Sequence, residues 1–204
     1  RNLTCVFDAP GLEAHAFMLL TAFAAPLLKL DARQGFTVSA LGDTGVGKST
    51  IGKFLASVYG HPDLTWIKRN DTALARLQRI GAYYSLPIYM DEVTTITPKE
   101  VRELVYSIAT GKGRDSLKQD RTLREGVEWA TILVTSTNDS LQAKLQIEKQ
   151  NAEAESMRLF EFRFPRVPAF ESVAGLIHAT LADNYGVAGA TYIQELVNNR
   201  VQIK

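Results

Sequence analysis

The sequence predicts an α/β fold in which a central, parallel, five-stranded sheet is flanked by helices and followed by a short C-terminal helical appendage. Three observations support this fold class. Short β-rich runs alternate with helical patterns along the chain. A glycine-rich loop joins the first of these runs to a helix. Acidic and polar side chains come directly after strands, where parallel sheets form their ligand sites.

The first element is a helical pattern over 12–30, which contains the most apolar stretch of the chain, AFMLLTAFAAPLL at 16–28. Thirteen residues, with Pro26 among them, are too few to cross a bilayer. A helix that is apolar on all sides is otherwise found inside a core. We therefore expect this helix to be buried.

The next elements surround the glycine-rich loop. The β-rich run 35–41 leads into it. Ile51 and Leu55 lie on one face of the helix predicted over 48–59. A second strand is predicted over 64–68. The loop is therefore expected between a strand and a helix.

A helix, a strand and a second helix occupy the middle of the chain. Apolar residues repeat at helical spacing over 72–84, and a buried strand over 87–93 ends in two acids. The segment TPKE at 97–100 is a capping box with proline at the first helical position. It begins a helix that Gly111 is expected to end.

The last elements complete the alternation. A buried strand is predicted over 129–138 and a final strand over 158–164, with helical patterns over about 171–184 and 190–202. The predicted organisation has three parts: a helical segment at 1–35 that packs on the core, a core at 36–165, and a short helical segment at 166–204.

Composition limits the class of function. The chain has 204 residues, 46% hydrophobic and 22% charged, as in ordinary globular proteins. The net charge is only +1, so any nucleic-acid site must be local. A lone Cys5 and scattered histidines (His15, His61 and His178) predict neither a zinc site nor a nucleophilic triad. Because the sequence starts at Arg1 without a signal-peptide pattern, we expect a fragment of a longer, cytoplasmic protein.

The loop GDTGVGKST at 42–50 has the spacing G-x-x-x-x-G-K-S of a phosphate-binding loop. Its glycines let backbone N–H groups approach phosphate oxygens, and the following helix adds the positive end of its dipole. Lys48 is expected to reach the β- and γ-phosphates of ATP, and Ser49 to bind Mg²⁺. The predicted nucleotide-binding residues are Gly42, Asp43, Thr44, Gly45, Val46, Gly47, Lys48, Ser49 and Thr50.

Asp91 and Glu92 are adjacent acids at the end of a hydrophobic strand. Asp91 is then placed to join the coordination shell of Mg²⁺. Glu92 would act as the general base that polarises the attacking water. The alternative is an acidic pair that is simply solvated at the end of a strand.

Polar residues also end the strand predicted over 129–138, which we expect to lie beside the acidic strand. Asn138 would orient the attacking water, and Thr135 or Thr137 could take its place. Alternatively, these side chains cap a helix that begins near Asp139.

Arg158 stands at the start of the last predicted strand. From a subunit boundary an arginine there could reach the γ-phosphate of a neighbouring subunit and stabilise transition-state charge. Arg163 and Arg166 are the next candidates. The alternative is a surface arginine, or one paired with Glu153 or Glu155.

The segment GKGRDSLKQDRTLR at 111–124 contains five basic and two acidic residues. Its glycines indicate an excursion or hairpin between a helix and a strand. Such segments can follow a nucleic-acid backbone, although a charged run is often only a solvated surface. The candidate nucleic-acid-binding residues are Lys112, Arg114, Lys118 and Arg121.

Four stretches together resemble a known family: GDTGVGKST, WIKRNDTALARLQRIGAYYSLPIYMDEV, VYSIATGKGR and WATILVTSTND. This family of phage, plasmid and mobile-element ATPases is catalogued as a domain of unknown function and is related to the superfamily-three helicases. The resemblance covers about residues 5–170. It implies a P-loop NTPase of the AAA+ type that forms a homo-oligomeric ring, with a hexamer expected, and a linked or associated primase or polymerase module.

The resemblance also implies roles for individual residues. The family's nucleotide-site positions correspond to Lys48, Ser49, Asp91, Glu92, Asn138 and Arg158. The chain departs from the pattern at 165–204, which is too short for a full AAA+ lid, so no lid-borne sensor arginine is assigned.

The leading hypothesis is an ATP-hydrolysing ring motor, the helicase or translocase domain of a phage or mobile-element replication protein. Its expected substrate is single-stranded or forked DNA, and no membrane association is expected. An AAA+ ATPase that remodels protein partners is the alternative. A P-loop small-molecule kinase is the third possibility, against which the acidic pair argues because it favours activation of water.

Overall fold

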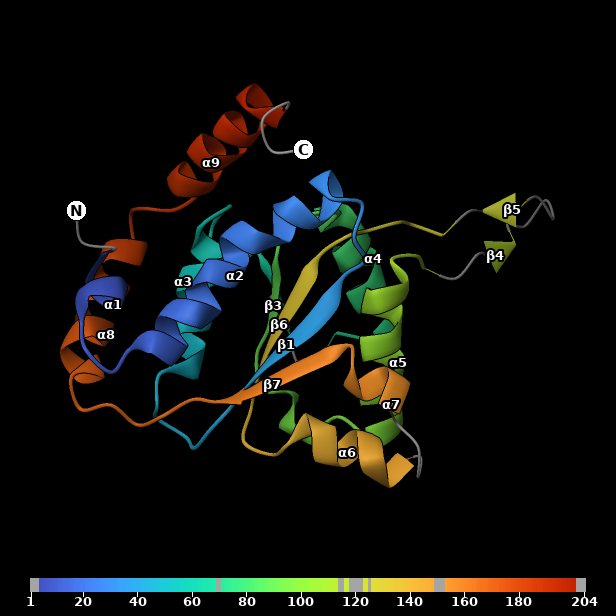
Figure 1. The fold of residues 1–204 in the computed structure, drawn as a ribbon, viewed down its shortest axis with the longest axis horizontal. Coiled ribbons are helices and arrows are strands. Elements are labelled where there is room, and N and C mark those ends of the chain that lie inside the picture. The colour runs from blue at the N-terminus through green and yellow to red at the C-terminus, as the bar shows by residue number, and fades with distance from the viewer. Residues whose placement is uncertain are drawn as a thin grey trace.

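The computed structural model describes residues 4–68, 71–113, 116–117, 123–124, 126–148 and 153–200. A twisted sheet crosses the middle of the molecule, with helices on both faces (Figure 1). Its five strands are all parallel, in the order β2 (Trp66–Ile67), β3 (Ile88–Met90), β6 (Ile132–Thr137), β1 (Phe36–Leu41) and β7 (Leu159–Arg163). The predicted α/β fold with a parallel five-stranded sheet is confirmed.

The strand register aligns the carboxyl ends of the three strands that carry the candidate motifs. Leu41 of β1 pairs with Thr137 of β6, and Met90 of β3 pairs with Thr135 of the same strand. The segments that follow these strands are the phosphate loop, the Asp91–Glu92 pair and Asn138. All three therefore begin at one edge of the sheet.

Helices cover both faces because side chains alternate along each strand. Val38 and Val134 belong to the core cluster under α2 (Glu13–Leu30) and α3 (Lys48–Ser57). Met90 and Leu133 belong to the cluster under α5 (Pro98–Thr110) and α6 (Leu141–Glu148). The strands are accordingly apolar on both faces, which explains why they were visible in the sequence as short continuous runs.

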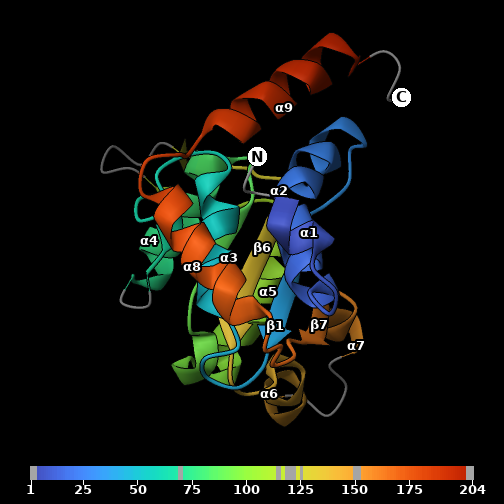
Figure 2. The same cartoon turned by 90° about the vertical axis from the view of Figure 1, so that its left-hand side faces the viewer.

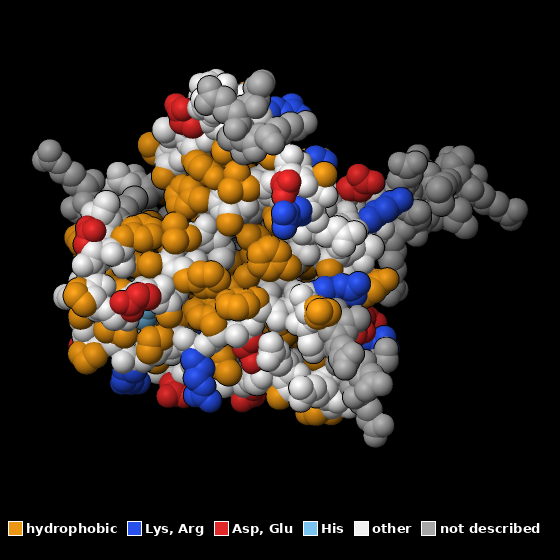
Figure 3. All heavy atoms as spheres, viewed as in Figure 1, with side chains coloured by type: hydrophobic (Ala, Val, Ile, Leu, Met, Phe, Trp, Pro, Cys, Tyr) orange, Lys and Arg blue, Asp and Glu red, His pale blue; other side chains and the backbone are white. Residues whose placement is uncertain are grey.

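The expectation that the apolar helix α2 is buried proved only half right. Met18 and Ala22 are fully buried, whereas Phe17 is 40% and Leu20 50% exposed. The centre of Phe17 lies 5.5 Å from that of Phe160 in the edge strand β7, and Figure 3 shows hydrophobic side chains gathered over this face. By length and composition α2 also passes as a membrane span, which is weak evidence, and 39% of it is buried inside the protein. The exposed side of the helix includes Phe17, which lies beside the edge strand β7.

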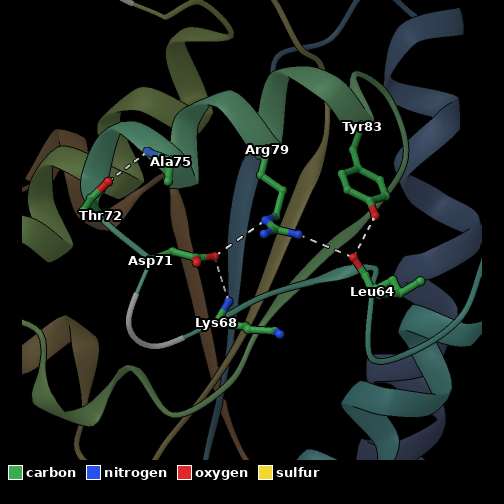
Figure 4. Close-up of polar contacts among 7 residues, drawn as sticks. All are labelled: Leu64, Lys68, Asp71, Thr72, Ala75, Arg79 and Tyr83. Carbon is green, nitrogen blue, oxygen red and sulfur yellow. Dashed lines mark hydrogen bonds and ion pairs between the residues drawn. The ribbon is translucent and has the colours of Figure 1, made fainter.

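Local polar contacts fix the turn between β2 and α4 (Ala73–Tyr83) (Figure 4). Asp71 accepts a hydrogen bond from the backbone of Lys68 at 3.1 Å and forms an ion pair with Arg79 at 3.6 Å. Arg79 and Tyr83 both donate to the carbonyl of Leu64, at 3.5 and 3.4 Å. These contacts hold α4 against the chain that enters the sheet's outer strand.

The capping box of α5 is present, with Thr97 and Glu100 each bonding the other's backbone, and Gly111 ends the helix at φ 73°. The predicted hairpin follows as β4 (Ser116–Leu117) and β5 (Leu123–Arg124), which pair antiparallel and project from the body in Figure 1. The hairpin leads into the amino end of β6, whereas Asn138 follows the carboxyl end of that strand. Three candidate DNA-binding residues, Arg114, Lys118 and Arg121, lie outside the described residues.

Several short elements were not predicted: α1 (Cys5–Asp8), the 3-10 helix η2 (Val93–Thr95), and α7 (Glu153–Ser156); α6 appeared only as an alternative. The C-terminal helices α8 (Phe170–Leu181) and α9 (Val187–Asn198) begin and end a few residues earlier than expected. Figure 2 shows α8 lying along α3, while α9 reaches α2 through the hydroxyl of Tyr192, which donates to the carbonyl of Phe23 at 2.8 Å.

Candidate active site

The phosphate loop depends on glycine at two positions. Gly45 and Gly47 have φ values of 83° and 99°, a left-handed conformation that costs other residues energy. A Cβ atom on Gly47 would also lie only 2.1 Å from the ring of Phe170 in α8. The loop is therefore shaped both by its own backbone and by the C-terminal helix that packs against it.

Lys48 is the first residue of α3 and is 7% exposed. Its ammonium group donates to the carbonyls of Gly42 at 2.5 Å and Asp43 at 2.7 Å, and to Oδ1 of Asn138 at 3.1 Å. Burial lowers the pKa of Lys48, while the nearby charges of Asp43 and Asp91 oppose that shift. The cation is thus held between the loop and the end of β6.

Asp91 and Ser49 face each other across the cavity. The Ser49 hydroxyl donates to Oδ1 of Asp91 at 3.0 Å. The same carboxylate oxygen accepts hydrogen bonds from Tyr89, at 2.6 Å, and from Ser136. A hydroxyl and a carboxylate at this separation form the hard oxygen donor set that Mg²⁺ prefers, so these residues fit the expected metal.

Glu92 adopts a left-handed conformation, with φ 52° and ψ 59°, that is uncommon for a residue with a side chain. In an extended strand, neighbours such as Asp91 and Glu92 would point to opposite faces. The left-handed turn ends β3 early and lets both acids line the same cavity. The backbone N–H of Glu92 donates to the hydroxyl of Ser136 at 3.0 Å, which holds this turn.

The polar end of β6 divides into residues that reach the cavity and one that does not. Asn138 and Thr137 line it, and the N–H of Asn138 donates to the hydroxyl of Thr94 at 3.0 Å. Thr135 is fully buried against β1 and is not part of the lining. The hydroxyl of Ser140 caps α6 by accepting a hydrogen bond from the N–H of Ala143 at 3.0 Å. The helix cap that was considered for the polar residues up to Asn138 is thus supplied by Ser140, which was not among them.

These groups surround a cavity of about 400 Å³, within the size range of small-molecule sites. The loop, β3 and β6 contribute predicted residues to its lining. Ser136, from the polar end of the strand predicted over 129–138, also lines it, whereas other lining residues were not singled out from the sequence: Thr94, Phe170, Glu171 and Ala174. The α8 residues had no signal, because they lie more than a hundred positions beyond the loop and match no motif.

His15 lies beneath the phosphate loop and is fully buried. Its Nε2 is 3.1 Å from the carbonyl of Val46, and its ring centre is 4.1 Å from that of Phe164 and 4.5 Å from that of Phe170. Burial lowers the pKa of His15, which favours the neutral ring. Residues from α2, β7 and α8 thus support the loop from below, although nothing in the sequence linked them.

Two more residues from the C-terminal part contact the loop from outside. Nη2 of Arg166 donates to the carbonyl of Thr44 at 3.2 Å. Nε2 of His178 lies 3.4 Å from the hydroxyl of Thr50. The region after β7 therefore closes one side of the candidate site within the same chain.

The structure separates Arg158 from the cavity of its own chain. It precedes β7, at the amino end of a strand whose carboxyl end adjoins the phosphate loop. Its guanidinium carbon lies 5.2 Å from the ring centre of Tyr106. Glu155, one suggested partner, instead forms an ion pair with Arg102 at 3.2 Å. Arg158 is therefore not part of the cavity lining of its own chain.

Comparisons with known proteins agree with this fold. SCCmec type IV Cch, described as an active helicase, is 23% identical with a TM-score of 0.72, over 98% of this chain and 38% of that chain. An inhibitor-bound JCV helicase is 13% identical (TM-score 0.46; 100% of this chain, 59% of that chain). NtrX from Brucella abortus in complex with ADP is 11% identical, with a TM-score of 0.43, over 80% of this chain and 38% of that chain. The first comparison shows a shared fold; the other two are too distant to support a conclusion.

No curated protein matches the sequence. A family model described as "Domain of unknown function (DUF927)" matches residues 12–127, more than half of the chain. The matched part includes the phosphate loop and the Asp91–Glu92 pair, two of the motifs on which the family resemblance was recognised. The chain belongs to the DUF927 family.

Proposed function

We propose that this chain is a Mg²⁺-dependent ATPase domain, the motor of a ring-forming helicase or translocase from a phage or mobile-element replication protein. The observation that carries the proposal is the arrangement of Lys48, Asp91, Glu92 and Asn138 around one cavity of about 400 Å³. A cation, two carboxylates and an amide are the groups that hydrolysis of a nucleoside triphosphate requires.

Each group has a defined task in this mechanism. The loop N–H groups and Lys48 bind the β- and γ-phosphates, and Ser49 and Asp91 would hold Mg²⁺. When bound, the metal ion neutralises charge on the phosphoryl oxygens. Glu92 accepts a proton from the attacking water, which Asn138 orients. Lys48 donates a hydrogen bond to Asn138. Binding of a γ-phosphate to Lys48 would therefore also change the contacts of Asn138 at the end of β6.

The proposed substrate is single-stranded or forked DNA. The hairpin after α5 carries the candidate contacts Lys112, Arg114, Lys118 and Arg121, which would bind phosphates and not bases. Such binding is tolerant of sequence and weakens as salt rises. Because the chain spans 38% of the SCCmec helicase chain, an attached primase or polymerase module also belongs to the proposal.

The proposed organisation comprises an N-terminal helical segment at 1–35, an ATPase core at 36–165 and a C-terminal helical segment at 166–204. Contacts of α2 with α3 and of α8 with α3 support the packing of both end segments on the core. A cytoplasmic location, within the host if the protein is phage-encoded, completes the proposal.

ATP hydrolysis should accelerate when single-stranded DNA is added, because a motor couples turnover to its track. The rate is measured with and without DNA at several salt concentrations, together with particle mass by light scattering in the presence of ADP. We expect stimulation that fades as salt rises, and the mass of a ring, with a hexamer expected. A DNA-independent rate in an assembled ring that binds no nucleic acid would instead favour remodelling of a protein partner, and phosphoryl transfer to a nucleoside or nucleotide would reveal a kinase.

Arg158→Ala and Lys48→Ala subunits should each be inactive alone, yet regain activity when mixed. In a head-to-tail ring, some interfaces of the mixture combine an intact pocket with an intact Arg158 from the neighbour. The matched control mixes Lys48→Ala with Glu92→Gln; both changes lie in one pocket, so every site lacks one group and no rate returns. An inactive Arg158→Ala mixture, with co-assembly verified by light scattering, would rule out action across the interface.

A further inference from the structure

We propose that two hydroxyl groups, those of Tyr89 and Ser136, act as positioning residues that fix the orientation of the Asp91 carboxylate toward the metal. The proposal rests on the nucleotide-hydrolysing function stated above. Neither residue belongs to the phosphate loop or to the acidic pair, and both donate to the same carboxylate oxygen, Oδ1.

Tyr89 is held rigidly in the middle of β3 and is fully buried. Its ring occupies the space that a side chain at position 52 would need, since a Cβ atom on Gly52 would lie 2.1 Å from it. The ring of Trp66 approaches to 5.8 Å between centres. Because α3 and β2 fix the ring, the Tyr89 hydroxyl is held where it donates a hydrogen bond to Oδ1 of Asp91 at 2.6 Å.

Ser136 connects the two acidic residues. Its hydroxyl donates to Oδ1 of Asp91 and accepts the backbone N–H of Glu92 at 3.0 Å. Glu92 is the residue in the left-handed conformation, which persists only where surrounding contacts hold it. Loss of Ser136 would therefore affect the metal-binding carboxylate and the placement of the general base together.

The two donors matter most when the metal binds. In the structure, Oδ1 of Asp91 accepts three hydroxyl groups, of which Ser49 is the one expected to turn toward Mg²⁺. Tyr89 and Ser136 remain as donors after that turn and keep the carboxylate from rotating. Residues that orient a metal ligand in this way commonly change metal affinity about 10–100-fold when they are removed.

The test is Tyr89→Phe, which removes the hydroxyl and keeps the ring beneath α3. Mn²⁺ binding to the ADP-loaded protein is measured by electron paramagnetic resonance, and the Mg²⁺ concentration for half-maximal ATPase is measured in parallel. The dissociation constant for Mn²⁺ and the Mg²⁺ concentration for half-maximal ATPase should each rise about tenfold in Tyr89→Phe. Affinity for ADP without metal should stay unchanged, which a general loss of structure would not allow.

Tyr59→Phe is the matched control, because Tyr59 is another tyrosine of this core whose hydroxyl donates to a carbonyl, that of Ala22 at 3.1 Å, outside the cavity lining. It should leave metal affinity unchanged. Ser136→Ala should raise the metal requirement and, unlike Tyr89→Phe, also lower kcat at saturating Mg²⁺, because Glu92 loses its backbone partner. Wild-type Mn²⁺ affinity in both Tyr89→Phe and Ser136→Ala would overturn the positioning role, whereas failure of the wild-type protein to bind a metal–nucleotide complex would overturn the proposed function itself.

Discussion

Replacement of Lys48 by alanine should weaken ATP binding and lower the rate of hydrolysis by at least about a hundredfold, the effect of removing one preorganised charge-stabilising group from an active site. Lys48 is 7% exposed, and its ammonium group donates to oxygens of the loop and of Asn138. Its three N–H donors are all used in these bonds, so at least one of them turns toward phosphate when ATP binds. The measurement is the steady-state ATPase rate together with nucleotide affinity by calorimetry.

Lys53→Ala provides the control for that change. Lys53 belongs to the same helix α3, but its ammonium group lies 5.5 Å from the ring centre of Trp66, and the residue is not part of the cavity lining. It should retain wild-type turnover. A Lys48→Ala protein that is folded and hydrolyses ATP at more than half the wild-type rate would contradict the assignment of the loop as the catalytic phosphate site.

Glu92→Gln should leave ATP binding intact while it lowers hydrolysis about 10²- to 10⁴-fold, the usual contribution of a general base. The amide has nearly the size of the carboxylate but does not accept the proton of the attacking water. The backbone bond from Glu92 to Ser136 does not involve the side chain, so the left-handed turn should persist. Single-turnover hydrolysis and ATP affinity are measured on the same preparation.

An exposed glutamate of α5 supplies the comparison, since Glu103→Gln removes the same charge outside the cavity lining and should not change the rate. Near-wild-type hydrolysis in Glu92→Gln would move the base role to another group. Loss of ATP binding in Glu92→Gln would show that the residue supports the pocket's structure and not only the chemistry.

Much of the framework could be predicted from local sequence patterns. The phosphate loop, the capping box at Thr97 and the five strands each depend on residues within a few positions of one another. Their backbone preferences act on that same short scale. The parallel sheet then follows from the alternation of strands and helices, and it places the loop, Asp91 and Asn138 at one edge. For this reason the central residues of the candidate site were identified before the structure.

The surroundings of the site depend on contacts between segments far apart in sequence. The burial of His15 beneath Val46, the fit of Phe170 over Gly47 and the packing of Tyr89 against Gly52 have no local pattern. Each contact depends on how a whole helix packs on the sheet, and that packing is the sum of many small van der Waals contacts between side chains. The same packing left one side of α2 exposed, although its composition favoured a buried helix.

The sequence by itself thus determined the type of fold and the positions of the glycine-rich loop and the acidic pair, because glycine geometry, strand alternation and side-chain charge are properties of short segments. Only the tertiary structure decided that α8 forms a wall of the candidate cavity, that Tyr89 and Ser136 share one oxygen of Asp91, and that Arg158 lies away from that cavity. The physical reason is that these features are set by the relative positions of elements, and those positions depend on which surfaces fit together in the folded chain.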